Sequence, residues 1–203
     1  MFEGFKIVVS LFALTLVFSI PLGIVVTSLK LSGNKIISSI TSLYILVMRG
    51  TPLLLQIIII YFGLPLVGVV FDRFESAVLA FTLNYAAYFA EIFRGGVLSI
   101  DKGQNEACKV LGFSKLTMYR RIIFPQVLKR ILPPISNEII TLVKDTSLVY
   151  IIGLNDILRV AQIAANREVS LMPLVEAGII YLAMIAVLTQ LLNMLEKKFS
   201  YYK

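Results

Sequence analysis

Long apolar runs alternate with short polar segments along this chain. The first run, residues 7–29, contains 23 residues without a charge, and a helix needs about 20 mostly apolar residues to cross the hydrocarbon core of a membrane. Glu3 and Lys6 precede it and cancel in charge, and neither a basic start nor a small-residue cleavage site is present. The pattern therefore predicts a first membrane-spanning helix that is not a cleaved signal peptide.

Four further runs follow. Residues 36–71 carry Arg49 as their only charge and are too many for one span, so Gly63, Pro65 and Gly68 are expected to end the helix and leave an irregular outer segment. The other three spans are expected at about residues 74–94, 131–156 and 172–195. The prediction is an all-α integral membrane protein with five transmembrane helices, organised as a single domain over residues 1–203.

Composition supports a membrane protein. Hydrophobic residues make up 58% of the chain, mean hydropathy is +0.89, and charged residues amount to 15% against about 25% in soluble domains. So few charges cannot solvate the surface of a globule of this size. A soluble domain, a disordered chain, a coiled coil and a secreted disulfide scaffold are all excluded.

Missing residue types exclude several kinds of chemistry. The chain has no His and one Cys, Cys108, so it cannot by itself assemble a His-built zinc site, a His-ligated haem, a Ser-His-Asp triad or a disulfide framework. None of its twelve glycines begins a phosphate-binding P-loop. We expect no metal site, no catalytic residue and no bound cofactor. If the protein pumps a solute, a partner or an ion gradient must supply the energy.

The net charge is +7. The basic residues cluster between the apolar runs, which is typical of cytoplasmic loops rather than of a nucleic-acid interface. With the N-terminus outside, five spans place thirteen Lys and Arg residues on the inner side and four on the outer side. The positive-inside rule therefore predicts an outer N-terminus and a cytoplasmic C-terminus. It also places the polar segment of about residues 98–130 in the cytoplasm.

This polar segment is expected to form a helical hairpin. Asp101 can cap a short helix on which Ala107, Val110 and Leu111 share one apolar face, and Gly112 can end that helix. An amphipathic hairpin at the inner face of a membrane protein either lies on the lipid surface or docks into another protein. The residues by themselves leave both alternatives open.

The hairpin carries a motif. Glu106-Ala107-Cys108, Gly112 and the sequence IIFP at 122–125 have the spacing EAA-x3-G-x9-I-x-L-P, with Cys108 in place of the second Ala and Phe124 in place of Leu. This resembles the loop of membrane subunits of ABC importers. MRGTPLLLQ (48–56), YFGLP (61–65), NYAAYFAEIFRGGVLSI (84–100), LPPISNEI (132–139) and KDTSLV (144–149) are similar to the permease family for polar amino acids, the histidine, glutamate, glutamine, arginine and opine group.

The resemblance implies the type I ABC importer permease fold in a bacterial inner membrane. It implies a non-catalytic subunit that works with an identical or similar second permease, with a dimer of ATPase subunits that binds ATP and Mg, and with an extracellular or periplasmic amino acid binding protein. In the family this loop is a coupling helix held by the ATPase. We therefore expect Glu106 to make a polar contact with the ATPase and Gly112 to provide the bend, with an ordinary helix cap as the less favoured alternative for Gly112. The apolar seat is expected to consist of Ala107, Cys108 and Leu111.

Polar residues at membrane depth mark a candidate pathway, because an ionisable residue there costs about 2.5–3.5 kcal/mol on insertion scales. The third span places Asn84, Tyr88 and Glu91 on one helical face. If the fourth span is a regular helix, its acidic residues project to one side. The candidate substrate-pathway residues are Arg49, Asn84, Tyr88, Glu138, Thr141, Asp145, Thr146, Ser147 and Asp156.

Each candidate also has a structural interpretation. Arg49 could be an ion-pair partner at a helix break, Asn84 and Tyr88 could hydrogen-bond between helices, and Lys144 could pair with Asp145. Glu91 and Arg94 more often form a structural pair than a ligand site. If the acidic residues do line the pathway, they favour a cationic amino acid such as arginine, lysine or histidine as the substrate.

Three other functions are compatible with the sequence. A permease for another solute, such as methionine or an inorganic anion, would share the same fold. A gradient-driven carrier or channel would use Arg49, Glu91 and Asp145 as ion or proton relays. A membrane-embedded enzyme has the least support, because no nucleophile is paired with a recognisable base.

Overall fold

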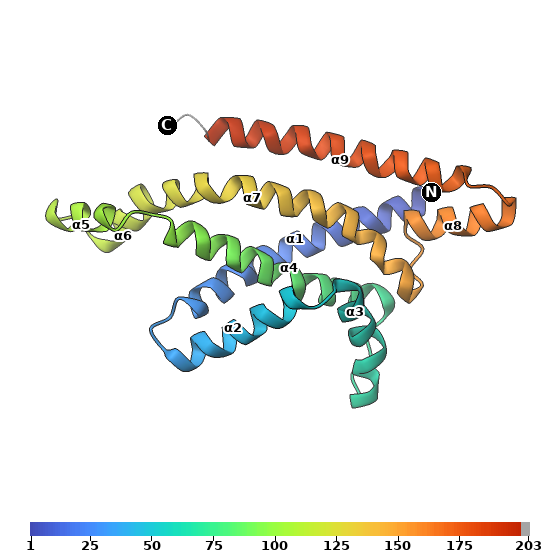
Figure 1. Ribbon diagram of the computed structural model, residues 1–203, viewed down its shortest axis with the longest axis horizontal. Helices are drawn as coiled ribbons and strands as arrows, with labels where there is room; N and C mark the ends of the chain where they lie inside the picture. Colours follow the sequence, from blue (N-terminus) through green and yellow to red (C-terminus); the bar gives the residue numbers. More distant parts are fainter. Residues whose placement is uncertain (200–203) are drawn as a thin grey trace.

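The protein is an elongated helical bundle in a computed structural model that describes residues 1–199 (Figure 1). Three helices are each long and apolar enough to cross a membrane: α1 (Phe2–Lys30), α4 (Arg73–Leu98) and α9 (Met172–Phe199). Two further spans are bent helix pairs, so the bundle has five spans when each pair is counted once. The described residues contain no strand, and the five predicted spans are confirmed.

The second span breaks in its middle. Helix α2 (Lys35–Gly50) is followed by α3 (Leu53–Ile58), a π-helical turn (Ile59–Gly63) and a 3-10 turn (Leu64–Val67), and the two halves meet at an angle of 105°. Pro52 has no N–H to continue the α2 ladder, and Thr51 before it is extended, as proline requires of its neighbour. Gly68 ends the second half with a φ of +84° as expected, but the main break lies at Thr51-Pro52.

The fourth span is irregular at both ends. It runs through α6 (Lys115–Met118), a π-helical turn (Tyr119–Ile123), α7 (Phe124–Asp145) and a 3-10 turn (Thr146–Ile152). Gly153, with a φ of +81°, ends it, and α8 (Ile157–Glu168) follows at 56°. Helix α8 is absent from the sequence prediction. Because the regular α-helix stops at Asp145, the expectation that Asp156 projects to the same side as Glu138 and Asp145 is wrong.

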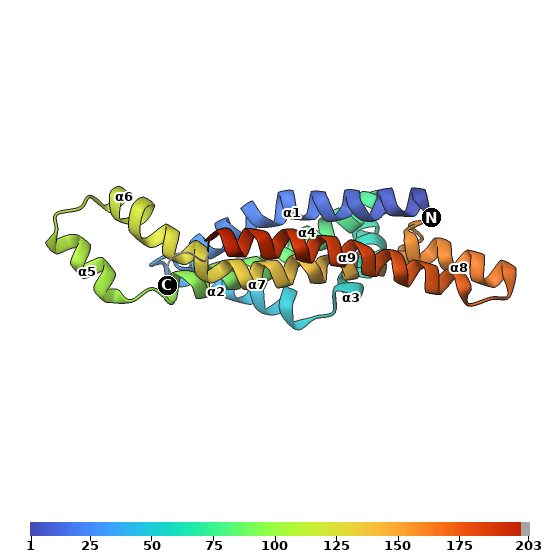
Figure 2. The same cartoon turned by 90° about the horizontal axis from the view of Figure 1, so that it is seen from above.

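The ends of the bundle differ. Helices α5 (Lys102–Val110) and α6 form a hairpin that projects from one end, and α8 and the start of α1 lie at the opposite end (Figures 1 and 2). The Asp101 carboxylate accepts a hydrogen bond from the Gly103 N–H at 2.6 Å, which confirms the predicted cap of α5. Helix α9 runs back toward the hairpin end (Figure 1).

Small residues allow α1 and α4 to form the most extensive helix contact of the bundle. A Cβ atom at Gly23 would lie 2.9 Å from the Phe89 Cβ, so only glycine permits this approach. The Thr27 hydroxyl crosses the interface and donates to the Ala90 carbonyl at 3.0 Å. Close backbone packing of this kind replaces the hydrophobic driving force, which is absent between helices in lipid.

Helices α4 and α7 also meet at a glycine, which provides a test of this packing. A Cβ at Gly96 would collide with Ile131 Cγ2, whereas a Cβ at Gly95 would meet no atom within 4 Å. Gly96→Ala should lower the free energy of unfolding by about 1–3 kcal/mol, the usual cost of overpacking.

The measurement is the melting temperature of the detergent-solubilised protein, with Gly95→Ala as the matched control. Gly95→Ala should leave the melting temperature unchanged or slightly raised, because alanine favours the helix. Equal melting temperatures for the two variants would contradict the tight α4–α7 contact.

Candidate functional site

A pair of buried side-chain amides holds the bend of the second span. Asn84, on α4, is 3% exposed, and its Nδ2 donates to the Met48 carbonyl at 2.9 Å and to Gln56 Oε1 at 3.0 Å. Gln56 Nε2 in turn donates to Thr51 Oγ1 at 2.8 Å and to the Met48 carbonyl at 3.0 Å. The amide of Asn84 is therefore committed to interhelical hydrogen bonds, the structural alternative for this residue.

Gln56 is a structural residue that the sequence interpretation missed. It is 8% exposed and connects the two halves of the broken span to α4. Its signal is the position of a polar amide four residues after Pro52, inside an otherwise apolar run. Carbonyl groups freed by a proline break need new donors inside a membrane, so a nearby Gln is the type of residue to expect.

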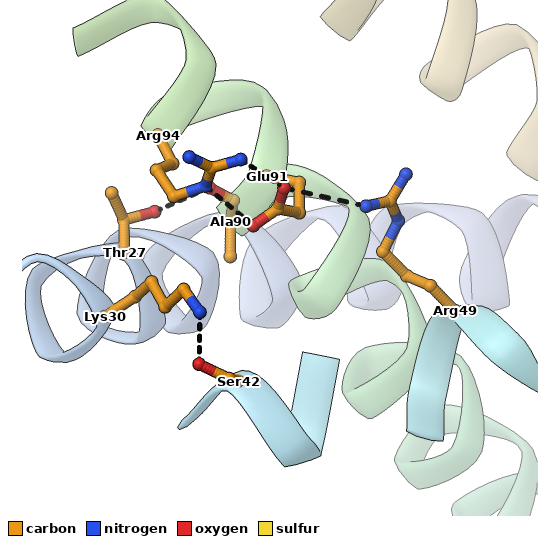
Figure 3. Close-up of polar contacts among 7 residues, drawn as sticks. All are labelled: Thr27, Lys30, Ser42, Arg49, Ala90, Glu91 and Arg94. Atoms are coloured by element: carbon orange, nitrogen blue, oxygen red, sulfur yellow. Dashed lines mark hydrogen bonds and ion pairs between the residues drawn. The ribbon is translucent and has the colours of Figure 1, made fainter. Parts of the chain in front are cut away.

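Three charged residues join α2 to α4. Both guanidinium nitrogens Nε and Nη2 of Arg94 donate to the Glu91 carboxylate at 2.8 Å, and Arg49 Nη1 lies 3.7 Å from the same carboxylate (Figure 3). The Arg49 guanidinium also stacks over the Tyr88 ring, 5.1 Å from its centroid. Glu91 and Arg94 thus form the expected structural pair, and Arg49 is an ion-pair partner beside the helix break. The Arg49 side chain is still 42% exposed.

A second polar cluster lies where α4 faces α7. Tyr85 Oη donates to Asp145 Oδ2 at 2.7 Å, so the partner of Asp145 is Tyr85, and Lys144 is exposed. Glu138 is half-buried, lies two helical turns from Asp145 on the same face, and is within electrostatic range of both Asp145 and Arg49. The Tyr85 and Tyr88 rings are 6.2 Å apart, so Asp145, bonded to Tyr85, and Arg49, which lies over Tyr88, contact neighbouring side chains of α4.

The small hydroxyl residues of the fourth span are bonded locally. Thr146 donates to the Val143 carbonyl at 2.7 Å, and Ser147 donates to the Lys144 carbonyl at 2.8 Å. Thr141 is half-buried on α7. These hydroxyls satisfy carbonyl groups near the end of α7 and shape the turn that follows it.

Asp156 lies apart from this region. It is fully buried, and its carboxylate accepts from the N–H groups of Leu158 at 3.0 Å and Arg159 at 3.1 Å, which caps α8. Tyr181 Oη on α9 lies 3.4 Å from the same carboxylate. A carboxylate engaged in this way positions α8 and is not available to a molecule passing between the helices.

The projecting hairpin presents an apolar surface. Glu106 and Ala107 are exposed, as are Val110 and Leu111, which are 88% and 69% exposed. Cys108, however, is 3% exposed and packs into the protein core. The expectation that Cys108 forms part of the apolar seat is therefore wrong, because its side chain is turned inward between α5 and the start of the fourth span.

Gly112 caps α5 and bends the chain at the same point. Its φ is +72°, its N–H donates to the Lys109 carbonyl at 3.1 Å, and the Phe113 N–H donates to the Cys108 carbonyl at 3.0 Å. This pair of bonds is a Schellman cap. The two interpretations of Gly112, a cap and a bend, therefore describe one structure.

Comparison with known proteins settles the family. Residues 19–201 match the family described as binding-protein-dependent transport system inner membrane component. The chain belongs to this family. It is 42% identical over 198 residues to the arginine transport system permease protein ArtQ of Bacillus subtilis, covering 97% of this chain and 90% of that protein. It is 32% identical to the putative glutamine transport system permease protein GlnP of Rickettsia bellii, covering 97% of this chain and 91% of that protein.

A solved structure agrees. The crystal structure of an amino acid ABC transporter with histidines contains a chain that is 35% identical, with a TM-score of 0.90, and the match covers 97% of this chain and 92% of that one. The resemblance to amino acid ABC permeases and the type I importer permease fold are thereby confirmed. Subunits of this kind are non-catalytic membrane components that work with a separate ATPase, a second permease and a binding protein.

Among residues 1–199, no three Cys, Asp or Glu residues are grouped so that they could hold a metal ion. The candidate functional features of this part of the chain are the polar side chains of α2, α4 and α7 and the surface of the hairpin.

Proposed function

We propose that this chain is the permease subunit of an importer for cationic amino acids such as arginine, lysine or histidine. The observation that carries the proposal is that Asp145 is bonded to Tyr85 while Arg49 lies over the neighbouring Tyr88 ring, with Glu138 on the same face of α7 as Asp145. A cationic amino acid presents a carboxylate and a positively charged side chain. The exposed part of the Arg49 guanidinium would meet the carboxylate, while Glu138 and Asp145 would meet the positive charge.

Other residues shape this pathway. The ring of Tyr88 would hold Arg49 in place by stacking, and Asn84 would keep the second span open at its bend. Thr141, Thr146 and Ser147 would line the end of the path on the fourth span. The relatives support an amino acid as the cargo. One is an arginine permease and another a putative glutamine permease, so the choice of a cationic amino acid rests on Glu138 and Asp145.

The hairpin would couple the pathway to ATP hydrolysis. ATP and Mg would be bound by the partner ATPase dimer, whose closure would carry α5 and α6 along and rock the bundle from inward-facing to outward-facing. Glu106 would make the polar contact, and Ala107, Val110 and Leu111 the apolar one, because all four are exposed on the hairpin. The Gly112 cap would transmit the movement by holding α5 at a fixed angle.

Exposed charged residues support an arrangement of the subunit in the membrane. The whole chain would form one transmembrane domain, paired with a second copy or a similar permease, and a binding protein would deliver substrate at the α8 end. Lys144 is exposed near the end of α7, and a charge near a membrane span favours contact with a partner or a wet pathway over lipid. Basic residues concentrated on the hairpin favour a cytoplasmic location for it and an outer N-terminus.

Reversal of charge at Glu106 tests the coupling. Glu106→Lys should leave the subunit inserted in the membrane but reduce ATPase co-purification and substrate-stimulated ATP hydrolysis about tenfold, because a charged hydrogen-bond partner is lost and replaced by repulsion. Glu3→Lys, an equal charge change at the opposite end of the bundle, should leave ATPase co-purification unchanged. Normal coupled transport in Glu106→Lys would remove this role from the hairpin.

Neutralisation of Asp145 tests the cargo. The measurement is the binding of arginine, lysine, histidine and glutamine to the permease–ATPase complex in nanodiscs. We expect tighter binding of the cationic amino acids than of glutamine, and about a tenfold weaker affinity for arginine in Asp145→Asn with ATPase binding intact.

Glu176→Gln, which removes a carboxylate from the exposed face of α9, is the matched control and should bind arginine as the unmodified complex does. Unchanged arginine affinity in Asp145→Asn would make Asp145 a structural residue, and preferential binding of glutamine would contradict the cationic cargo.

A further inference from the structure

An open pocket of about 530 Å³ lies between α1, α2 and α4 and shares only Arg49 with the region assigned to the substrate. Lys30, the last residue of α1, forms one side, Ser42 and Arg49 of α2 another, and Glu91 and Arg94 of α4 the third (Figure 3). Because α1 ends here and α4 is within a few residues of its end, the pocket lies toward the hairpin end of the bundle (Figure 1).

The pocket carries an excess of positive charge. Its lining includes three cationic side chains and a single carboxylate, Glu91, which is already bound in a bidentate manner by Arg94. Lys30 donates to the Ser42 hydroxyl, and within residues 1–199 no carboxylate lies at ion-pair distance from its ammonium group. The three cations and one carboxylate leave two positive charges in excess, and an anion beside Lys30 would offset part of that excess.

An apolar surface adjoins the charges. The outer face of α2 exposes Ile40, Leu43 and Leu46, which are 65%, 60% and 67% exposed, and Leu46 also lines the pocket. These residues recur at helical spacing and form one stripe along α2. A free inorganic anion would use only the cationic groups, whereas a molecule with an anionic head and an apolar tail would cover the stripe as well.

We propose that this pocket binds the phosphate headgroup of an anionic phospholipid, with its acyl chains along the apolar stripe of α2. Basic pockets between transmembrane helices near the membrane surface have the charge and depth that acidic lipid headgroups require. The lipid phosphate would accept from Lys30 and from the guanidinium of Arg94, which leaves Arg49 to the substrate region. It would thereby join the end of α1 to α2 and α4, beside the bend of the second span.

Lipid retention measured by native mass spectrometry tests this site. The complete permease–ATPase complex is reconstituted with phosphatidylcholine and phosphatidylglycerol, extracted into detergent, and its bound phosphatidylglycerol is counted. Lys30→Gln keeps a donor for Ser42 but removes the charge, and should weaken the apparent affinity for phosphatidylglycerol about fivefold. Lys30→Arg should retain the lipid.

Lys35→Gln is the matched control, because Lys35 is exposed near the same end of the bundle and does not line the pocket. It should change phosphatidylglycerol retention less than twofold, within the effect of one screened surface charge. Equal losses in Lys30→Gln and Lys35→Gln would overturn the site. So would release of the lipid by inorganic phosphate alone, which would assign the pocket to a free anion, or a failure of the unmodified complex to prefer phosphatidylglycerol over phosphatidylcholine.

Discussion

The structure depends on how a membrane helix can be broken without leaving backbone groups unpaired. Pro52 removes a hydrogen bond and turns the second span through 105°, and each unsatisfied carbonyl in hydrocarbon costs several kcal/mol. The Asn84 and Gln56 amides supply the missing donors to the Met48 carbonyl from two directions. The bend is therefore a specified feature of the sequence, and α4 is the helix against which it is held.

Charged side chains lie next to the bend. Arg49, in the last turn of α2, contacts Tyr88 and Glu91 of α4, and Glu138 and Asp145 lie on one face of α7. Tyr85 donates to Asp145 from one side, so that carboxylate has a fixed position and a second oxygen for another partner. Charged groups that are already paired and partly exposed can bind a zwitterionic amino acid transiently, without a deep enclosed pocket.

Much of this architecture could be predicted from the sequence, because spans follow from the length of apolar runs and the family follows from motifs. The caps at Asp101 and Gly112 could also be predicted. A capping side chain and a positive φ both depend only on residues close by in the sequence. Arg49 and the Glu91–Arg94 pair were readable as candidates for ion pairs at membrane depth. These features depend on a few neighbouring residues.

The errors concern tertiary context. Both Pro52 and the later Gly63 and Gly68 can end a helix, and the hydrophobic pattern does not show at which of them the chain turns. The side-chain direction of Cys108 depends on the packing of α5 against the fourth span. Asp156 would share a face with Asp145 only on a helix that stays regular beyond Gly153. Its capping role depends on α8, which the hydrophobic pattern does not predict. Gln56 and Tyr85 act through partners distant in sequence.

Hydrogen–deuterium exchange across the bend tests the central claim most directly. In the intact permease–ATPase complex, the amides of residues 48–58 should be protected, and Gln56→Leu should accelerate their exchange about tenfold, because loss of a buried hydrogen bond lowers the free energy of local opening. Gln190→Leu, the same substitution at an exposed position of α9, should leave it unchanged. Unaltered protection of residues 48–58 in Gln56→Leu would contradict the account.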